Sequence, residues 1–116
     1  MFVSHRDKIE KIELTSEEVK GVTKQILIGP DEGWEDHVMR MFTLTDGGHA
    51  PMHTHDWPHT IYVVEGEGML YFDGKEHRLT AGSTAYIDSN MEHQIRNWGT
   101  SHFVFLCIVP RRGDSV

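Results

Sequence analysis

The sequence predicts an all-β domain built from many short strands, closed into a barrel or folded into a sandwich. From Val22 onward, the apolar residues fall in short runs that are rich in β-branched and aromatic side chains, which favour extended backbone. Turn-forming residues separate these runs, and no stretch after Val22 repeats its apolar residues at helical spacing. Short strands joined by regular turns are typical of barrels and sandwiches rather than of alternating α/β sheets.

Eight strands are expected, each bounded by turn-forming residues. The clearest turn is Asp73-Gly74, because a two-residue hairpin turn needs positive φ at both positions and this pair adopts it readily. The expected strands span residues 23–28, 38–44, 60–65, 68–73, 76–79, 84–87, 93–97 and 102–109.

The first 22 residues are the hardest to assign. Residues 9–14 favour an edge strand. Thr15 and Glu18 have the spacing of a capping box and could begin a short helix, with a polar loop as the equal alternative. The expected division of the chain is an N-terminal arm at 1–22 that packs on the barrel, the barrel at 23–110 and a C-terminal tail at 111–116.

Composition limits the classes of partner. The chain has 116 residues, enough for one domain with a buried core, and a formal net charge of −7. Such an acidic chain does not favour nucleic acid, whose phosphates select a basic surface. No apolar run reaches the roughly 18 residues of a membrane span, and the first residues lack an apolar leader, so we expect a cytoplasmic protein. Cys107 is the single cysteine, which excludes an internal disulfide and a multi-cysteine zinc site.

The chain carries nine histidines, five of them between residues 49 and 77. His53 and His55 are two residues apart, so in an extended chain both imidazoles point to the same face. His59 opens one expected strand and His93 opens a later one, and a barrel can bring two strand starts together. Three or four neutral nitrogen ligands suit Mn, Fe, Co, Ni, Cu or Zn and suit Ca or Mg poorly. The four histidines are therefore a candidate site for a divalent transition metal.

The spacing of these histidines resembles the two sequence motifs of the cupin family. The first motif has Gly, five residues, His-x-His, three or four residues, Glu, six residues and Gly. The second has Gly, five residues, Pro-x-Gly, two residues, His, three residues and Asn. The residues that match the first are Gly47, His53, His55, His59 and Gly66, and those that match the second are Gly82, Asp88, Asn90, His93 and Asn97. Such complete spacing disfavours the alternative that these are unrelated surface histidines.

Three positions depart from the family pattern. Asp88 stands where the second motif has proline, and Asn90 where it has glycine, and a turn tolerates both changes. His59 stands where the first motif has glutamate. The resemblance therefore implies the four-histidine subgroup of single-domain cupins, with a jelly-roll (double-stranded β-helix) barrel and one metal ion per chain. It also implies a homodimer whose N-terminal strands add to the partner's sheet, because exposed strand edges invite pairing.

Six further residues are expected to line a substrate pocket beside the metal, from strand parity or from the resemblance. Both faces of the last strand are apolar, so it is the resemblance that implies inward Phe105 and Cys107. An inward Arg40 would anchor a carboxylate or another anion, and an outward Arg40 is the equal alternative. Cys107 could be a buried apolar residue, a pocket thiol sensitive to oxidation or, least favoured, a fifth metal ligand. The six residues are Arg40, Phe42, Ile61, Ile95, Phe105 and Cys107.

Four imidazoles would leave about two positions open on a metal that prefers six ligands, and an open position indicates a reactive or substrate-binding site. The first hypothesis is a metal-dependent oxidoreductase, a dioxygenase or peroxide-using oxygenase acting on a small organic molecule. Its metal would be Mn or Fe, with Ni, Cu, Co and Zn as alternatives. The second hypothesis is a non-redox cupin enzyme, an isomerase or decarboxylase. The third is a non-catalytic small-molecule-binding or sensor module.

Overall fold

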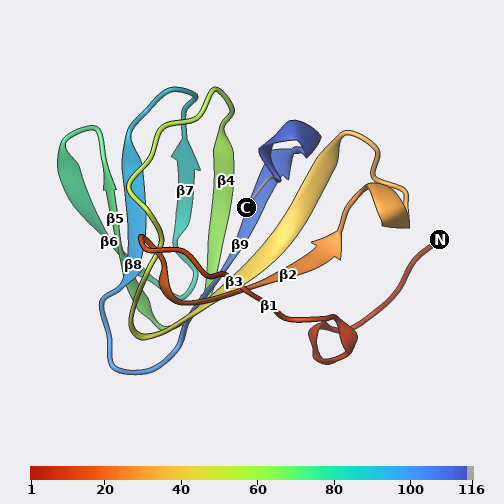
Figure 1. The fold of residues 1–116 in the computed structure, drawn as a ribbon, viewed down its shortest axis with the longest axis horizontal. Coiled ribbons are helices and arrows are strands. Elements are labelled where there is room, and N and C mark those ends of the chain that lie inside the picture. The colour runs from red at the N-terminus through yellow and green to blue at the C-terminus, as the bar shows by residue number, and fades with distance from the viewer. Residues whose placement is uncertain (115–116) are drawn as a thin grey trace.

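Nine strands form a single antiparallel sheet that curls into a nearly closed barrel (Figure 1). The computed structural model describes residues 1–114, and the number of strands refers to these residues. The strands are β1 (Ile12–Glu13), β2 (Lys20–Ile28), β3 (His37–His49), β4 (His59–Glu65), β5 (Glu67–Phe72), β6 (Lys75–Thr80), β7 (Thr84–Ile87), β8 (His93–Asn97) and β9 (Phe103–Pro110). The 3-10 helices are η1 (Arg6–Lys8), η2 (Pro30–Glu32) and η3 (Arg111–Gly113). Within residues 1–114, no helix has the length and apolar character needed to span a membrane.

The longest strand, β3, links the two halves of the barrel. The sheet order is β6-β5-β8-β3-β9-β4-β7, with β2 paired to β3 and β1 paired to β2. β3 pairs with β9 along residues 37–44, and its far end meets β8 where His49 faces Arg96. Strands that follow one another in the chain, such as β6 and β7, lie in different halves of the sheet. This crossing of the chain between halves is typical of a jelly roll.

Alternate residues of the strands fill the barrel. In β4, His59, Ile61 and Val63 are buried while the side chains between them are exposed, as expected for a strand with one face in the core. β8 follows the same pattern, with His93 and Ile95 buried. Because both strands begin with a buried histidine, their rows of core side chains start with an imidazole.

The all-β fold predicted from the sequence is confirmed, and so are the eight expected strands, whose ends differ by a few residues. Asp73 and Gly74 have φ values of 54° and 72°, the positive values that the hairpin turn requires. Asn90 has φ of 65°, so it takes the left-handed conformation that glycine would adopt more easily at this position.

The short helix considered after Thr15 is wrong, and the loop alternative is confirmed. Residues 16–19 form a turn in which the amide of Val19 donates to the carbonyl of Ser16 at 3.2 Å. β2 begins directly afterwards, which leaves too few residues to offset the cost of starting a helix. The expected edge strand shortens to β1, which pairs with β2 of the same chain. The division of the chain at residues 22 and 110 stays a prediction.

Candidate metal centre

Four histidine side chains meet inside the barrel wall. His53 and His55 lie on the segment between β3 and β4, whereas His59 is the first residue of β4 and His93 the first residue of β8. The segment is held against β8 because the backbones of His53 and His93 exchange two hydrogen bonds of 3.0 Å. The amide of Asn90 also donates to the carbonyl of His55. Backbone pairing therefore brings the two motif regions together.

The imidazole rings lie close to one another. Ring centroids are 3.9 Å apart for His53 and His55, and 5.0 Å apart for His53 and His93. One ring nitrogen from each of these three residues lies within 4.8 Å of the others, so the three could hold one metal ion. The ring of His59 lies 4.9 Å from that of His93 and 5.2 Å from that of His55, beside this trio.

Hydrogen bonds orient two of the rings. Nδ1 of His93 lies 2.9 Å from the carbonyl oxygen of Met91, which can only accept, so Nδ1 carries the proton and Nε2 is left as a free lone pair. Nδ1 of His59 lies 3.3 Å from Sγ of Cys107. Nε2 of His59 is buried and has no hydrogen-bond partner within residues 1–114. Buried polar atoms rarely lack a partner, and a metal ion would provide one for this nitrogen.

All four imidazoles are held in the neutral form that a metal requires. Burial is the largest cause in each case, and it lowers the pKa of His53 to about 4 and that of His59 to about 3. Repulsion from the neighbouring histidines lowers both values further, and Arg40 adds to the effect on His59. The pKa values of His55 and His93 are also lowered, mainly by burial. The donor set and its protonation therefore fit a divalent transition metal.

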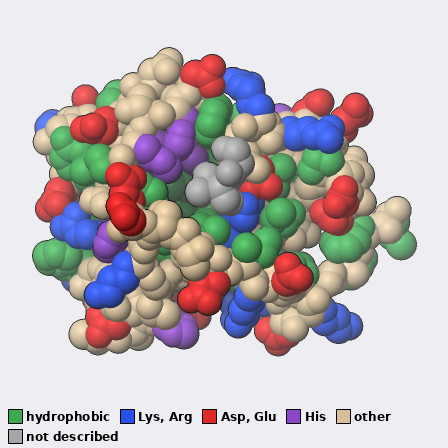
Figure 2. Space-filling model, in the orientation of Figure 1, with side chains coloured by type: hydrophobic (Ala, Val, Ile, Leu, Met, Phe, Trp, Pro, Cys, Tyr) green, Lys and Arg blue, Asp and Glu red, His purple; other side chains and the backbone are tan. Residues whose placement is uncertain are grey.

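A cavity with mainly apolar walls adjoins the histidines. Figure 2 shows histidine side chains gathered at a hollow, with hydrophobic side chains next to it. All six residues expected to line a pocket border this cavity: Arg40, Phe42, Ile61, Ile95, Phe105 and Cys107. Leu14 and Val19 of the N-terminal segment and Gly113 after β9 also line it, and none of the described lining residues is Asp or Glu.

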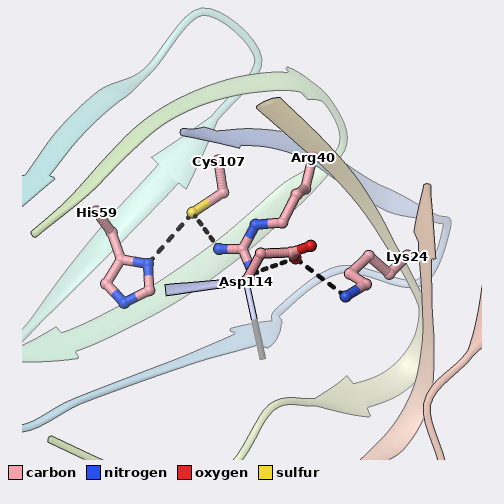
Figure 3. Close-up of polar contacts among 5 residues, drawn as sticks. All are labelled: Lys24, Arg40, His59, Cys107 and Asp114. Atoms are coloured by element: carbon pink, nitrogen blue, oxygen red, sulfur yellow. Dashed lines mark hydrogen bonds and ion pairs between the residues drawn. The ribbon is translucent and has the colours of Figure 1, made fainter. Parts of the chain in front are cut away.

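A chain of polar contacts leads from His59 past Arg40 to Asp114 and Lys24 (Figure 3). Sγ of Cys107 lies 3.2 Å from Nη2 of Arg40 and also contacts His59. Nη1 of Arg40 lies 3.6 Å from Oδ1 of Asp114, and the same oxygen is 3.1 Å from Nζ of Lys24. Arg40 is thus buried and lies inward, and the alternative of an outward arginine is wrong.

Cys107 is buried and also borders the cavity, so its surroundings agree with both a buried apolar residue and a pocket thiol. Burial raises the pKa of its thiol, although the Arg40 guanidinium opposes the rise, so the thiol is protonated at neutral pH. Its sulfur contacts Nδ1 of His59, on the side of the ring away from Nε2. This contact suits a residue that orients His59 for a metal held by Nε2, and it disfavours a fifth metal ligand.

Trp57 supports the histidine cluster by stacking on one of its rings. Its ring stacks on His55, with centroids 4.6 Å apart and planes 7° apart. Gly113 packs against the indole so closely that a Cβ there would lie 2.6 Å from Nε1 of Trp57. The segment after β9 therefore fixes Trp57, and Trp57 fixes the plane of His55.

Two charged residues that lie near the cavity were not predicted from the sequence. Lys24 is buried and lies two residues after the buried Val22 in β2. Because alternate residues of a strand share a face, this spacing could have predicted that Lys24 points inward. Asp114 has no such signal, because its ion pair with Lys24 spans 90 residues of sequence. His102 is exposed, and neither His102 nor the partly buried His49 lines the cavity.

The fold and the site together define a class, an all-β jelly-roll domain with a histidine cluster that could hold a metal ion. Residues 40–109 match the family described as the Cupin domain. This match covers more than half of the chain, so the chain belongs to the cupin family, as the two motifs indicate. Membership of the four-histidine subgroup stays a prediction.

Relatives of this chain are diverse. It is 31% identical to the oxalate-binding protein of Thermotoga maritima over 67 residues, which are 57% of this chain and 55% of the relative. It is 33% identical to auxin-binding protein 1 of Arabidopsis thaliana over 78 residues, 60% of this chain and 39% of the relative. The chain thus spans about half or less of these curated relatives. Among solved structures, the polyketide cyclase RemF from Streptomyces resistomycificus superposes with a TM-score of 0.88 at 26% identity, covering 95% of this chain and 79% of the cyclase.

Proposed function

We propose that this chain binds one divalent transition-metal ion through His53, His55, His59 and His93. The observation that carries this proposal is the buried, unpartnered Nε2 of His59, on a ring that lies beside those of His55 and His93. Three of the four imidazoles are already spaced to share an ion, and the low pKa of each keeps it neutral. Mn or Fe is the proposed metal, with Ni, Cu, Co and Zn as alternatives.

The proposed activity is oxidation of a small organic molecule, by dioxygenase or peroxide-using oxygenase chemistry. A bound Mn or Fe ion would supply Lewis acidity and electron transfer. The protein's part is to exclude water with Phe42, Ile61 and Phe105, and to bind an anionic group through Arg40. None of the described lining residues is an Asp or Glu that could act as general base, and this supports oxygen chemistry over proton transfer.

A non-redox reaction is the second candidate, and the inward position of Arg40 favours it. A buried guanidinium beside a divalent ion suits a keto acid or an oxalate-like substrate of an isomerase or decarboxylase. The similarity to a protein named for oxalate binding supports a small carboxylate ligand. A non-catalytic binding module is the third candidate.

One experiment separates the three candidates. Protein reconstituted with Mn, Fe, Cu, Ni or Zn would be assayed for oxygen uptake and product formation across aromatic, enol and keto-acid compounds, with and without oxygen. Metal-dependent oxygen uptake is the expected result, and a His93→Ala variant is the matched control. Turnover with Zn and without oxygen would favour the non-redox enzyme. Ligand-dependent thermal shifts without turnover for any metal would overturn both enzyme proposals and leave the binding module.

A homodimer is the proposed assembly. β1 is a two-residue edge strand whose exposed Ile12 and neighbouring backbone could pair with a partner. Light scattering tests this directly, because a monomer at micromolar concentration would contradict it.

A further inference from the structure

The guanidinium of Arg40 is a buried charge whose hydrogen bonds are incompletely satisfied. The residue is 2% exposed and lines the cavity. Nη2 donates to the sulfur of Cys107, a weak acceptor, and Nε has no partner within the described part of the chain. An arginine carries five N–H donors in a planar fork, and a buried charge is stable only when it is well paired. Arg40 therefore has donors to offer to a further anionic group in the cavity.

Asp114 is the one carboxylate of residues 1–114 that forms an ion pair with Arg40, and the pair is loose. Its Oδ1 lies 3.6 Å from Nη1 of Arg40 but 3.1 Å from Nζ of Lys24. The same oxygen thus serves two cations, and Lys24 has the closer contact. Asp114 engages one guanidinium nitrogen instead of the two that a bidentate carboxylate would engage.

The turn before Asp114 is anchored to two other segments: the amide of Arg111 donates to the carbonyl of Asp36 at 2.9 Å, and Nη2 of Arg112 donates to the carbonyl of Asp56 at 3.0 Å. Asp114 follows η3, a single three-residue turn, and the amide of Asp114 donates to the carbonyl of Arg111 at 3.2 Å. Gly113 lies at the cavity wall against Trp57. The backbone of this turn is therefore held in place, but the side chain of Asp114 is 15% exposed. Its carboxylate can leave Arg40 by a change of rotamer, without a movement of β9.

We propose that Arg40 is a carboxylate subsite of the cavity, where the ligand's carboxylate exchanges with that of Asp114. The ligand class is a small dicarboxylate or keto acid, with one end at the histidine cluster and the other on the guanidinium fork. A short molecule suffices, because a single atom, Sγ of Cys107, contacts both Arg40 and His59. Lys24 retains Asp114 when the ligand takes its place on Arg40. The proposal rests on the proposed function in one respect, that the ligand enters the cavity beside the histidines.

Calorimetric titration with malonate and with malonamate, in which a carboxamide replaces one carboxylate, tests the subsite. Asp114→Asn removes the competing charge and should bind malonate about tenfold more tightly than the wild type, the effect of losing one charge-assisted contact. Asp46→Asn makes the same chemical change on an exposed residue of β3 that does not line the cavity, and should bind like the wild type. Arg40→Gln should lose the preference for malonate over malonamate, and Arg40→Lys, which keeps the charge without the fork, should retain part of it.

A measurement on the wild type covers the case in which these variants fold poorly. Saturating malonate should shift the carbon NMR resonance of the Asp114 carboxylate, because its side chain loses the Arg40 contact. An unchanged resonance with malonate bound would refute the exchange of carboxylates. Equal malonate affinity in folded Asp114→Asn and Asp46→Asn would refute it too, and an unaltered preference in Arg40→Gln would remove the subsite.

The titrations also separate this proposal from the metal proposal. They are run on metal-free and Mn-loaded protein, with metal content measured in each. Malonate binding that depends on Arg40 in a protein that takes up no metal would overturn the metal centre and leave the subsite standing. A protein that binds metal but does not distinguish malonate from malonamate would overturn the subsite and leave the metal centre standing.

Discussion

The thiol of Cys107 lies directly behind His59, with its sulfur 3.3 Å from Nδ1 of the imidazole. The two residues are 48 positions apart in the sequence and meet because β4 and β9 are neighbours, with Ile61 paired to Cys107. If a metal binds Nε2, Nδ1 of the neutral ring carries the proton and donates a hydrogen bond to the sulfur. The contact therefore connects His59, a proposed metal ligand, to Cys107, which also contacts Arg40.

Removing this contact should weaken metal binding. Partners that orient a metal-binding histidine typically contribute about 10-fold to 100-fold in affinity, so we expect a loss of that size in Cys107→Ala. Cys107→Ser keeps an acceptor and should lose less. Competition with a chromogenic chelator measures both affinities, and wild-type affinity in both variants would show that the sulfur does not position His59.

His59 is expected to be a metal ligand although the cupin motif has glutamate at its position. His59→Ala should lose most of its bound metal, whereas His59→Glu restores a family ligand and should keep about one ion per chain. Because glutamate adds negative charge, this variant should bind anions more weakly. Elemental analysis of the purified variants gives the occupancy, with exposed His102→Ala as the control. Full occupancy in His59→Ala would remove this residue from the ligand set.

The metal-free protein should become less stable as the pH falls below the pKa of an ordinary histidine. In the unfolded chain a histidine has a pKa near 6.5, whereas burial lowers the pKa of His59 to about 3 and that of His53 to about 4. Below pH 6.5 the unfolded chain binds protons that the folded chain does not. The free energy of unfolding should therefore drop as the pH falls from 6.5 toward these folded values.

For the buried His59 alone, the slope should approach about 1.4 kcal/mol per pH unit; the half-buried His53 should add less because solvent screens it. Urea unfolding of chelator-treated protein between pH 7.5 and 5 measures the slope. His59→Gln should flatten it. A stability that stays constant over this range in the wild type would contradict the neutral, buried state of these imidazoles.

Gly113 should not tolerate a side chain. A Cβ at this position would lie 2.6 Å from Nε1 of Trp57, and the indole cannot retreat freely because it stacks on His55. Gly113→Ala should destabilise the fold by about 1–3 kcal/mol, as overpacking does, and should weaken metal binding through the displaced His55. At Gly99 the nearest atom is 3.5 Å from the added Cβ, so Gly99→Ala is the control. Equal unfolding midpoints for the two variants would show that the indole moves aside at no cost.

Local patterns in the chain predicted the strands, their turns and the histidine set. Alternation along His59, Ile61 and Val63 specifies a strand with one buried face wherever it lies in the fold. The turn at Asp73-Gly74 depends only on the φ values that these two residues accept. The spacing of the histidines matches the two cupin motifs. The barrel and the candidate metal ligands could therefore both be predicted from the sequence.

The inward position of Arg40 and its partners was decided by the tertiary structure alone. Arg40 and Cys107 are 67 residues apart, and Lys24 and Asp114 are 90 apart, so their contacts depend on strand register and leave no local pattern. Parity could not orient the last strand either, because both of its faces are apolar. The sequence by itself thus determined a jelly roll with four candidate ligands. The tertiary structure decided that the thiol of Cys107, the guanidinium of Arg40 and the carboxylate of Asp114 follow His59 in a chain of contacts. The pairing of β9 with β3 and β4 aligns His59, Cys107 and Arg40, and the turn after β9 brings Asp114 to Arg40.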